Sequence, residues 1–347
     1  MEINSLIREN IKNLQPYSCA RDEYSGDSAT FLDANENPYD TGYNRYPDPY
    51  QRQLKVQLAR IKGVPAENMM LGNGSDEIID ILIRSVCEPA EDNIIVFSPG
   101  YSMYEVSAAI NNVEVRKINL TSEFLPDWAE MWKQADAHTK IVFLCTPNNP
   151  TGKVIPIGQI REVCRNFGGL VLVDEAYIDF TDEMSAVKLL DEFPNVVVLQ
   201  TLSKAWGMAG LRLGICFAGQ ELIRVLNKVK APYNISNLTQ QTVLRILEQY
   251  DEFEAKLSAI KAQRERLSCA LAGTGLFERV CDSEANFILV TTPRFRELYD
   301  YLVANQVVVR LRNIAPLIEG GIRITVGTQA ENDRLLALLD EFRNRIK

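Results

Sequence analysis

The sequence predicts an α/β fold, with a large domain whose mainly parallel sheet is sandwiched by helices and a smaller α+β domain towards the C-terminus. Over residues 69–201, short apolar runs alternate with segments of helical periodicity, as is typical of parallel strands buried on both faces. The 347 residues also exceed the usual size of a single hydrophobic core. We expect an N-terminal arm over residues 1–30, packed on the small domain or a dimer partner. The large domain would cover 31–235 and the small domain 236–347.

The expected elements of the large domain follow one another in a regular order. The arm has helical character, and the loop at residues 43–49 is rich in proline and aromatic residues. Residues 51–61 place Leu54, Leu58 and Ile61 on one stripe, which predicts an amphipathic helix. Five apolar runs then predict strands, at residues 69–71, 93–97, 140–145, 170–173 and 196–201.

The pattern changes beyond residue 235. A long helical stretch covers residues 237–271, with a join near Tyr250. Short apolar runs and a final helical segment follow, which together are typical of an α+β domain. The expected strands lie at residues 285–290, 307–312 and 322–326, and the terminal helix starts at Glu331.

A polar segment follows each of the five strands predicted for the large domain. Because ligands of open α/β sheets bind at the carboxyl ends of the strands, we expect these loops to converge on one site. The loops are residues 72–77, 98–104, 146–152, 174–177 and 201–214.

The last of these loops carries Lys204 directly after a buried strand. Desolvation can lower the pKa of such a lysine towards neutrality, and its amine can then form a Schiff base with a carbonyl. Arg212 in the same loop is a fixed cation suited to a phosphate. The residues alone equally allow a surface helix that starts at Lys204, with the glycines as turn residues.

The first loop, residues 72–77, leads into a helical run at residues 78–83. A glycine turn before a helix presents free N–H groups and the positive end of the helix dipole, which suits an anion. The third glycine of a dinucleotide-binding motif is missing near Glu77, which disfavours a nucleotide-dependent dehydrogenase. A simple helix cap at Ser75 or Asp76 is an equal alternative.

Composition excludes several classes of protein. A net charge of -9 argues against a nucleic-acid partner, and no apolar run approaches the roughly 20 residues that span a bilayer. The first ten residues lack the apolar centre of a secretory signal. Seven scattered cysteines without a C-x-x-C pair suit a reducing cytoplasm. The single histidine, His138, argues against a Ser-His-Asp triad or a histidine-based metal site.

Taken together, the motifs resemble those of fold-type I aminotransferases that depend on pyridoxal 5′-phosphate (PLP), in the aspartate aminotransferase superfamily. The likeness extends from Pro16 to Thr328. Within the superfamily the motifs are similar to those of the histidinol-phosphate aminotransferase family. The most specific segments are residues 148–152, 174–177, 203–204 and 210–212.

The resemblance implies a role for each of these residues. Lys204 would bind PLP as an aldimine and move the substrate's Cα proton, and Asp174 would pair with the cofactor's ring nitrogen. Tyr177 and Asn149 would hydrogen-bond the ring oxygen, and Tyr101 would stack on the ring. On the residues alone, Asp174 could instead cap a helix, Asn149 could belong to a plain turn and Tyr101 could be a core aromatic.

The same resemblance implies a phosphate site and a homodimer with the active site at the interface. Tyr46 would reach the PLP phosphate from the neighbouring subunit. The residues of one chain expected around that phosphate are Gly74, Ser75, Asp76, Thr201, Ser203 and Arg212.

For the substrate, the resemblance implies binding by Tyr17, Asn149, Arg310 and Arg323. Arg312 lies on the same face as Arg310 by the period of two in a strand, and only the resemblance favours Arg310. Without the resemblance, Arg310 and Arg323 could equally form surface ion pairs.

The implied reaction belongs to histidine biosynthesis in the cytoplasm. L-Histidinol phosphate and 2-oxoglutarate would become imidazole acetol phosphate and L-glutamate, through aldimine and ketimine stages. The alternatives are an aromatic-amino-acid aminotransferase, a PLP-dependent decarboxylase of a phosphorylated amino acid and a PLP-binding module without catalysis.

Overall fold

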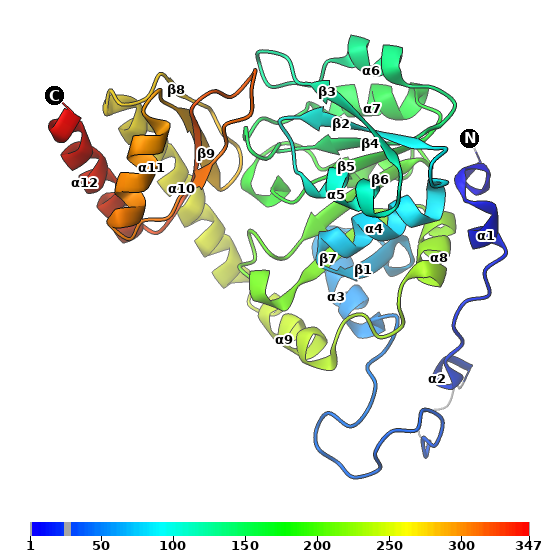
Figure 1. The fold of residues 1–347 in the computed structure, drawn as a ribbon. Helices are drawn as coiled ribbons and strands as arrows, with labels where there is room; N and C mark the ends of the chain where they lie inside the picture. Colours follow the sequence, from blue (N-terminus) through cyan, green and yellow to red (C-terminus); the bar gives the residue numbers. More distant parts are fainter. Residues whose placement is uncertain (1, 24–28, 347) are drawn as a thin grey trace.

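The protein is described by a computed structural model that covers residues 2–23 and 29–346. The parts of the predicted arm at residues 1 and 24–28 lie outside these ranges. The large sheet has seven strands in the order β1-β7-β6-β5-β4-β2-β3 (Figure 1). Only β7 runs antiparallel to its neighbours, β1 and β6. The strands are β1 (Met69–Asn73), β2 (Asn93–Ser98), β3 (Glu114–Asn119), β4 (Thr139–Cys145), β5 (Leu170–Asp174), β6 (Val196–Thr201) and β7 (Leu213–Ala218).

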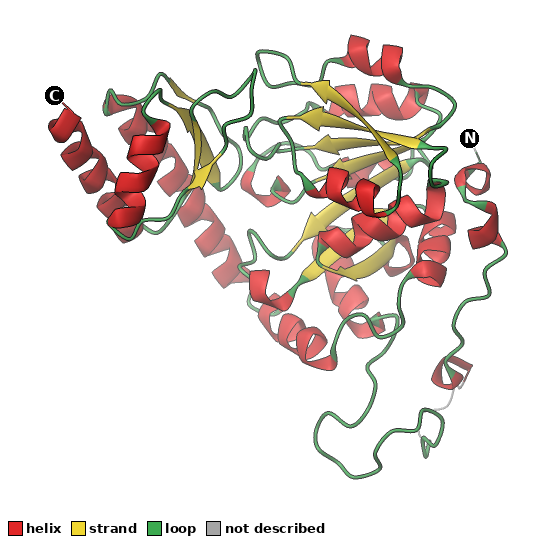
Figure 2. Cartoon of the chain, viewed as in Figure 1, coloured by secondary structure: helices red, strands yellow, loops and turns green. Residues whose placement is uncertain are grey.

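Helices cover both faces of this sheet (Figure 2). Since side chains alternate along a strand, Val171 and Val173 of β5 enter one apolar core, whereas Leu170 and Leu172 enter the other. The first core is covered by α3 (Arg52–Lys62), α6 (Trp128–Gln134), α7 (Ile157–Asn166) and α9 (Asn237–Leu247). The second is covered by α4 (Ser75–Val86), α5 (Met103–Ile110) and α8 (Gln220–Val229).

The N-terminal arm contains three short helical turns, η1 (Ile3–Leu6), α1 (Glu9–Lys12) and α2 (Ala20–Glu23). Ile3 and Ile7 are buried in the second core, beside α8. The start of the arm is therefore anchored on the large sheet by apolar contacts within the chain. Further single turns are η2 (Ala66–Asn68), η3 (Ile178–Phe180), η4 (Ala186–Leu189) and η5 (Ala209–Leu211).

A second, antiparallel sheet has the strand order β10-β11-β9-β8. Its strands are β8 (Arg279–Val280), β9 (Phe287–Thr291), β10 (Arg310–Leu311) and β11 (Gly321–Thr325), and its helices are α11 (Phe295–Ala304) and α12 (Gln329–Ile346). The long helix α10 (Tyr250–Gly273) joins the two parts of the molecule (Figure 1). Phe253, near its start, packs in a core of the large sheet, whereas Leu267 and Leu271 pack on the small sheet.

The predicted fold class is confirmed, and so is the break in the helical stretch near Tyr250, where α9 ends and α10 starts. Two strands of the large sheet were missed. β3 lies at the edge of the sheet and its side chains are mostly polar or charged, so it lacks an apolar run. β7 follows a glycine-rich loop closely. The strand expected at residues 307–312 is reduced to Arg310–Leu311. Among the described residues, no helix is long and apolar enough to cross a membrane.

Glu175 fixes the segment after β5 to the large sheet. Its carboxylate is 2% exposed and accepts hydrogen bonds from Ser185 Oγ at 2.6 Å, Ala186 N at 2.6 Å and Gln200 Nε2 at 2.9 Å. Burial raises the pKa of Glu175 from 4.5 to about 7, although these hydrogen bonds oppose the shift. The native state therefore disfavours the ionised carboxylate relative to the unfolded chain.

This shift predicts a pH-dependent stability. Because the native pKa is raised, the stabilisation is complete below pH 4.5 and is lost as the pH rises through about 7. We expect this group to lower the free energy of unfolding by about 3 kcal/mol over that interval. The Glu175→Gln variant should lack this drop in the free energy of unfolding, which is measured by urea denaturation at about pH 4.5 and about pH 8. As a control, Glu192→Gln changes an exposed carboxylate paired with Arg161. Equal pH dependence in Glu175→Gln and the wild type would contradict the assignment.

Candidate active site

A pocket lies at the carboxyl edge of the large sheet, where the loops after β1, β2, β4, β5 and β6 meet. The register of the parallel strands explains the convergence, since Cys145 at the end of β4 is paired with Asp174 at the end of β5. The structure brings most of the predicted site residues to this pocket. They are Gly74, Ser75, Asp76, Tyr101, Asn149, Asp174, Tyr177, Thr201, Ser203, Lys204, Arg212 and Arg323.

One end of the pocket is built from Gly74 and Arg212. Gly74 has a φ of +77°, and a Cβ atom there would lie 2.5 Å from Arg212 Nη2, so only glycine lets the guanidinium approach the start of α4. The Gly74 N–H donates to the Arg212 carbonyl at 2.8 Å. Arg212 is 3.6 Å from Asp76 Oδ2, and Tyr101 donates its hydroxyl to Asp76 Oδ1 at 2.9 Å.

Two hydroxyl residues complete this end. Thr201 Oγ1 accepts from the Ser203 N–H at 3.1 Å and lies 3.1 Å from the Leu213 carbonyl, to which it can donate. This turn holds Ser203 at the pocket, whose lining also includes Ser75 and Asp76 in the first turn of α4. A guanidinium, two hydroxyls and the positive end of a twelve-residue helix suit a phosphate dianion.

Lys204 lines the pocket in the turn after β6. Desolvation by the surrounding protein lowers the pKa of its amine, and the positive charge of Arg323 lowers it further. Lys204 Nζ lies 5.7 Å from the centre of the Tyr177 ring. Within residues 2–23 and 29–346, the amine has no hydrogen-bond or ion-pair partner. A lysine held this way is suited to act as a nucleophile and as a base.

Asp174 lies at the base of the pocket and is 3% exposed. Burial raises the pKa of its carboxyl group, whereas hydrogen bonds from Tyr104 and the Ala176 N–H lower it. Tyr104 donates to Oδ2 at 2.5 Å and Ala176 N to Oδ1 at 3.1 Å. Tyr104 was not among the site residues predicted from the sequence. Only its helical spacing from Tyr101 could have suggested that it faces the same region.

A chain of hydrogen bonds connects the two sheets across the pocket. Asn149 Nδ2 donates to the Tyr177 hydroxyl at 3.4 Å, and Asn149 Oδ1 accepts from Arg323 Nη1 at 2.5 Å. Asn148 holds the loop in place, because its Nδ2 donates to the Pro99 carbonyl at 3.1 Å. Burial raises the pKa of Tyr177, although the charge of Arg323 opposes the shift.

A second cluster of positive charge lies at the side of the small sheet. Arg312 lines the pocket beside Arg323, whereas Arg310 is not part of its lining. Desolvation lowers the pKa of Arg312, as do the nearby charges of Arg323 and Arg310. In the part of the chain that the structure describes, none of these three arginines forms an ion pair with a carboxylate. Because side chains alternate between the two faces of a strand, the sequence pattern could not distinguish Arg310 from Arg312. The predicted role of Arg310 stays a prediction.

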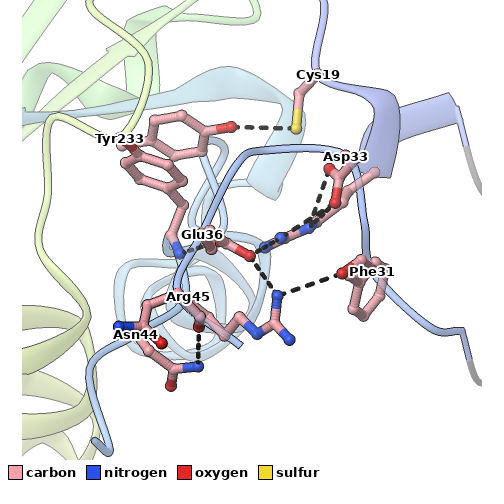
Figure 3. A network of polar contacts seen from close by, with 10 residues as sticks. Cys19, Phe31, Asp33, Glu36, Asn44, Arg45 and Tyr233 are labelled. Atoms are coloured by element: carbon pink, nitrogen blue, oxygen red, sulfur yellow. Dashed lines mark hydrogen bonds and ion pairs between the residues drawn. The ribbon is translucent and has the colours of Figure 1, made fainter. Parts of the chain in front are cut away.

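Tyr46 and Tyr17 lie outside the pocket of their own chain. Both are exposed, and both contact Tyr233, with Tyr46 stacked on it at 4.6 Å and Tyr17 edge-on at 6.4 Å between ring centres. Figure 3 shows the network that holds this region, in which the buried Glu36 carboxylate binds Arg45 Nη1 at 2.7 Å. Glu36 also accepts from Arg21 and from the Tyr46 N–H. The predicted contact of these two tyrosines with a partner subunit stays a prediction.

Comparison with known proteins defines the class. A family model described as aminotransferase class I and II matches residues 23–339, and the chain belongs to this family. Within the class it belongs with the histidinol-phosphate aminotransferases. The protein of that name from Cytophaga hutchinsonii is 48% identical over 98% of this chain and 99% of its own length. The one from Bacteroides fragilis is 47% identical over 98% and 99%.

Solved structures with the same fold include two enzymes of this name. Histidinol-phosphate aminotransferase from Sinorhizobium meliloti, in complex with pyridoxal-5′-phosphate, is 25% identical and has a TM-score of 0.78. The match covers 87% of this chain and 84% of that one. The enzyme of the same name from Clostridium acetobutylicum, at 24% identity and a TM-score of 0.79 over 88% and 92% of the two chains, shares the fold.

Proposed function

We propose that the chain transfers the amino group of L-histidinol phosphate to 2-oxoglutarate, with PLP as cofactor. The observation that carries the proposal is one pocket with two separate groups of anion-binding side chains. Arg212, Ser75 and Ser203 lie at one end, and Arg312 and Arg323 lie at the side of the small sheet. Lys204, whose amine has no partner among the described residues, lines the same pocket. A phosphorylated cofactor and a phosphorylated substrate would occupy these two groups.

The residues fit PLP. Gly74, Ser75, Ser203, Thr201 and Arg212 would hold its phosphate. The missing Cβ at position 74 is what lets the Arg212 guanidinium lie at this end of the pocket. Asp174 is a buried carboxylate without a bonded cation among the described residues, as a partner for a protonated ring nitrogen requires. Asn149 and Tyr177 would donate to the ring oxygen, and Tyr101 would lie against the ring.

When bound, PLP supplies a ring that accepts electrons from the substrate Cα. The protein supplies the proton transfers. Lys204 Nζ would hold the cofactor's carbonyl carbon and, once displaced by the substrate amine, take the proton from Cα. Desolvation lowers the pKa of the amine and so favours the unprotonated form that a base requires. Asp174 would keep the proton on the ring nitrogen throughout.

Arg323 and Arg312 would bind the anionic group of the substrate. Histidinol phosphate carries a phosphate, whereas glutamate and 2-oxoglutarate carry a second carboxylate, and a guanidinium fork can bind either group. Arg310 adds a third positive charge nearby, since the charge of Arg310 lowers the pKa of Arg323. Arg310, which the family resemblance favours, is the competing candidate for the direct contact.

We also propose that two copies form a homodimer in the cytoplasm, with Tyr46 and Tyr17 of each chain at the other chain's pocket. Exposed aromatic side chains on the segment that carries Tyr46 support this assembly, and these are Tyr39, Tyr43 and Tyr46. The expected division into an arm, a large domain over 31–235 and a small domain over 236–347 belongs to the same proposal. The small sheet would then carry Arg312 and Arg323 as one unit.

Paired substitutions test the substrate assignment. Arg312→Gln removes a charge-assisted hydrogen bond to phosphate, so we expect kcat/KM for histidinol phosphate to fall by about 10- to 100-fold. Arg310→Gln is the matched control and should lower it by less than about 3-fold. With phenylalanine, which has no phosphate, the loss of kcat/KM in Arg312→Gln should be smaller than with histidinol phosphate. The measurement is steady-state kinetics with 2-oxoglutarate as acceptor.

Two outcomes would overturn parts of this proposal. A wild-type preference for phenylalanine over histidinol phosphate would identify an aromatic-amino-acid aminotransferase instead. A larger loss in Arg310→Gln than in Arg312→Gln would assign the substrate phosphate to Arg310.

Mixing of the Lys204→Ala and Tyr46→Ala variants in equal amounts tests the shared site. Lys204→Ala lacks the catalytic amine, and Tyr46→Ala lacks the tyrosine given to the partner. A mixed dimer would contain one site with both substitutions and one site with neither, so about a quarter of the wild-type activity should return after subunit exchange. Activity that stays at the sum of the separate variants, with exchange verified by mass spectrometry, would argue that each site is complete within one chain.

A further inference from the structure

We propose that Tyr104 is a positioning residue that acts through Asp174, and this inference rests on the proposed function. Tyr104 is the second residue of α5 and is 3% exposed. Its hydroxyl donates to Asp174 Oδ2 at 2.5 Å. It does not line the pocket. The hydroxyl of Tyr104 therefore acts on the site through the carboxylate that would hold the cofactor's ring nitrogen.

The Tyr104 ring is fixed by its aromatic neighbours. It stacks on Phe143 of β4, with 4.6 Å between ring centres and an interplanar angle of 27°. It also meets Tyr101 edge-on at 5.5 Å and 81°. Rigid packing on two sides leaves the hydroxyl little freedom, so the Asp174 carboxylate is held in one orientation. Tyr104 thus contacts both Asp174 and Tyr101, the residue expected to lie against the cofactor ring.

The second effect of Tyr104 is electrostatic. Desolvation favours the neutral form of Asp174, and a neutral carboxyl group could not hold a proton on the ring nitrogen. The Tyr104 hydroxyl donates to the ionised form and opposes this effect. Burial and the charge of Asp174 raise the pKa of Tyr104 itself, so the phenol stays protonated and remains a donor.

Other ionisable groups also surround Asp174, on each element packed against it. Asp76 lies on α4 and disfavours the negative charge, whereas Lys204 after β6 favours it. Cys145 on β4, Tyr101 and Tyr177 are the remaining neighbours, and burial raises the pKa of each. Of all these groups only Tyr104 donates a side-chain hydrogen bond to Asp174. The backbone donor, Ala176 N, binds the other oxygen.

The test uses Tyr104→Phe, which keeps the ring and its stacking but removes the donor. PLP binding to the cofactor-free full-length protein is measured by fluorescence titration across a pH series. Loss of a hydrogen bond to a charged group predicts binding about ten-fold weaker at neutral pH. Because the pKa of Asp174 rises when the donor is removed, the loss of affinity on acidification should begin at a higher pH than in the wild type.

A double-mutant cycle separates this role from a general structural one. If Tyr104 acts through Asp174, Tyr104→Phe should have little further effect on PLP affinity in an Asp174→Asn background. Tyr301→Phe is the matched control, because it removes a phenol that donates to Glu341 at 3.0 Å, away from the pocket. It should change neither the affinity nor the pH profile.

The outcomes are distinct. Wild-type protein that does not bind PLP at all would overturn the proposed function. If the wild type binds PLP and Tyr104→Phe has the same PLP affinity and the same pH dependence of binding, only the role of Tyr104 would be overturned. If Tyr104→Phe weakens PLP binding as much in the Asp174→Asn background as in the wild type, the role of Tyr104 through Asp174 would likewise be overturned. If Tyr104→Phe folds poorly, 3-fluorotyrosine at position 104 provides the second test. Its more acidic phenol is a stronger donor and should move the pH profile in the opposite direction, and an unchanged profile would again contradict the role.

Discussion

Apolar cover on both faces of the large sheet determines where chemistry can occur in this protein. Side chains of β5 enter two separate cores, so ionisable groups can reach a ligand only at the ends of the strands. The parallel register sets Cys145 beside Asp174 at one such end, and the loops that follow begin at the same level. Lys204, Asp174 and Asn149 are neighbours for this reason, although they are far apart in the sequence.

The pocket contains positively charged side chains that no carboxylate of the described chain neutralises. Lys204, Arg312 and Arg323 have no carboxylate partner among the described residues. Desolvation lowers the pKa of the lysine and of Arg312, and the charge of Arg323 lowers both further. Such an arrangement costs stability unless anions bind to it. Asp174 provides the opposite charge at the base of the pocket, held by Tyr104. A cofactor with a phosphate and a protonated ring nitrogen satisfies both requirements at once, which is how the fold supports transamination.

Local patterns in the sequence predicted much of the site. Lys204 and Asp174 follow apolar strands directly, and a residue at that point can only lie at the edge of the sheet. Tyr104 could not be found this way, because its role depends on contact between α5 and the end of β5, which lie 70 residues apart. The strand expected at residues 307–312 would place Arg310 and Arg312 on one face, so sequence alone could not tell which one lines the pocket. In the structure, β10 ends at Leu311, and Arg312 follows it. β3 was not predicted, because this edge strand is mostly polar and has no apolar run to mark it.

The claim that Lys204 binds PLP covalently is the centre of this account, and reduction with borohydride followed by peptide mass spectrometry tests it most directly. Borohydride fixes a Schiff base as a stable secondary amine. We expect incubation with PLP and reduction to modify Lys204, with loss of the modification in Lys204→Arg. Modification of another lysine, or an unmodified protein that still binds PLP, would contradict the account.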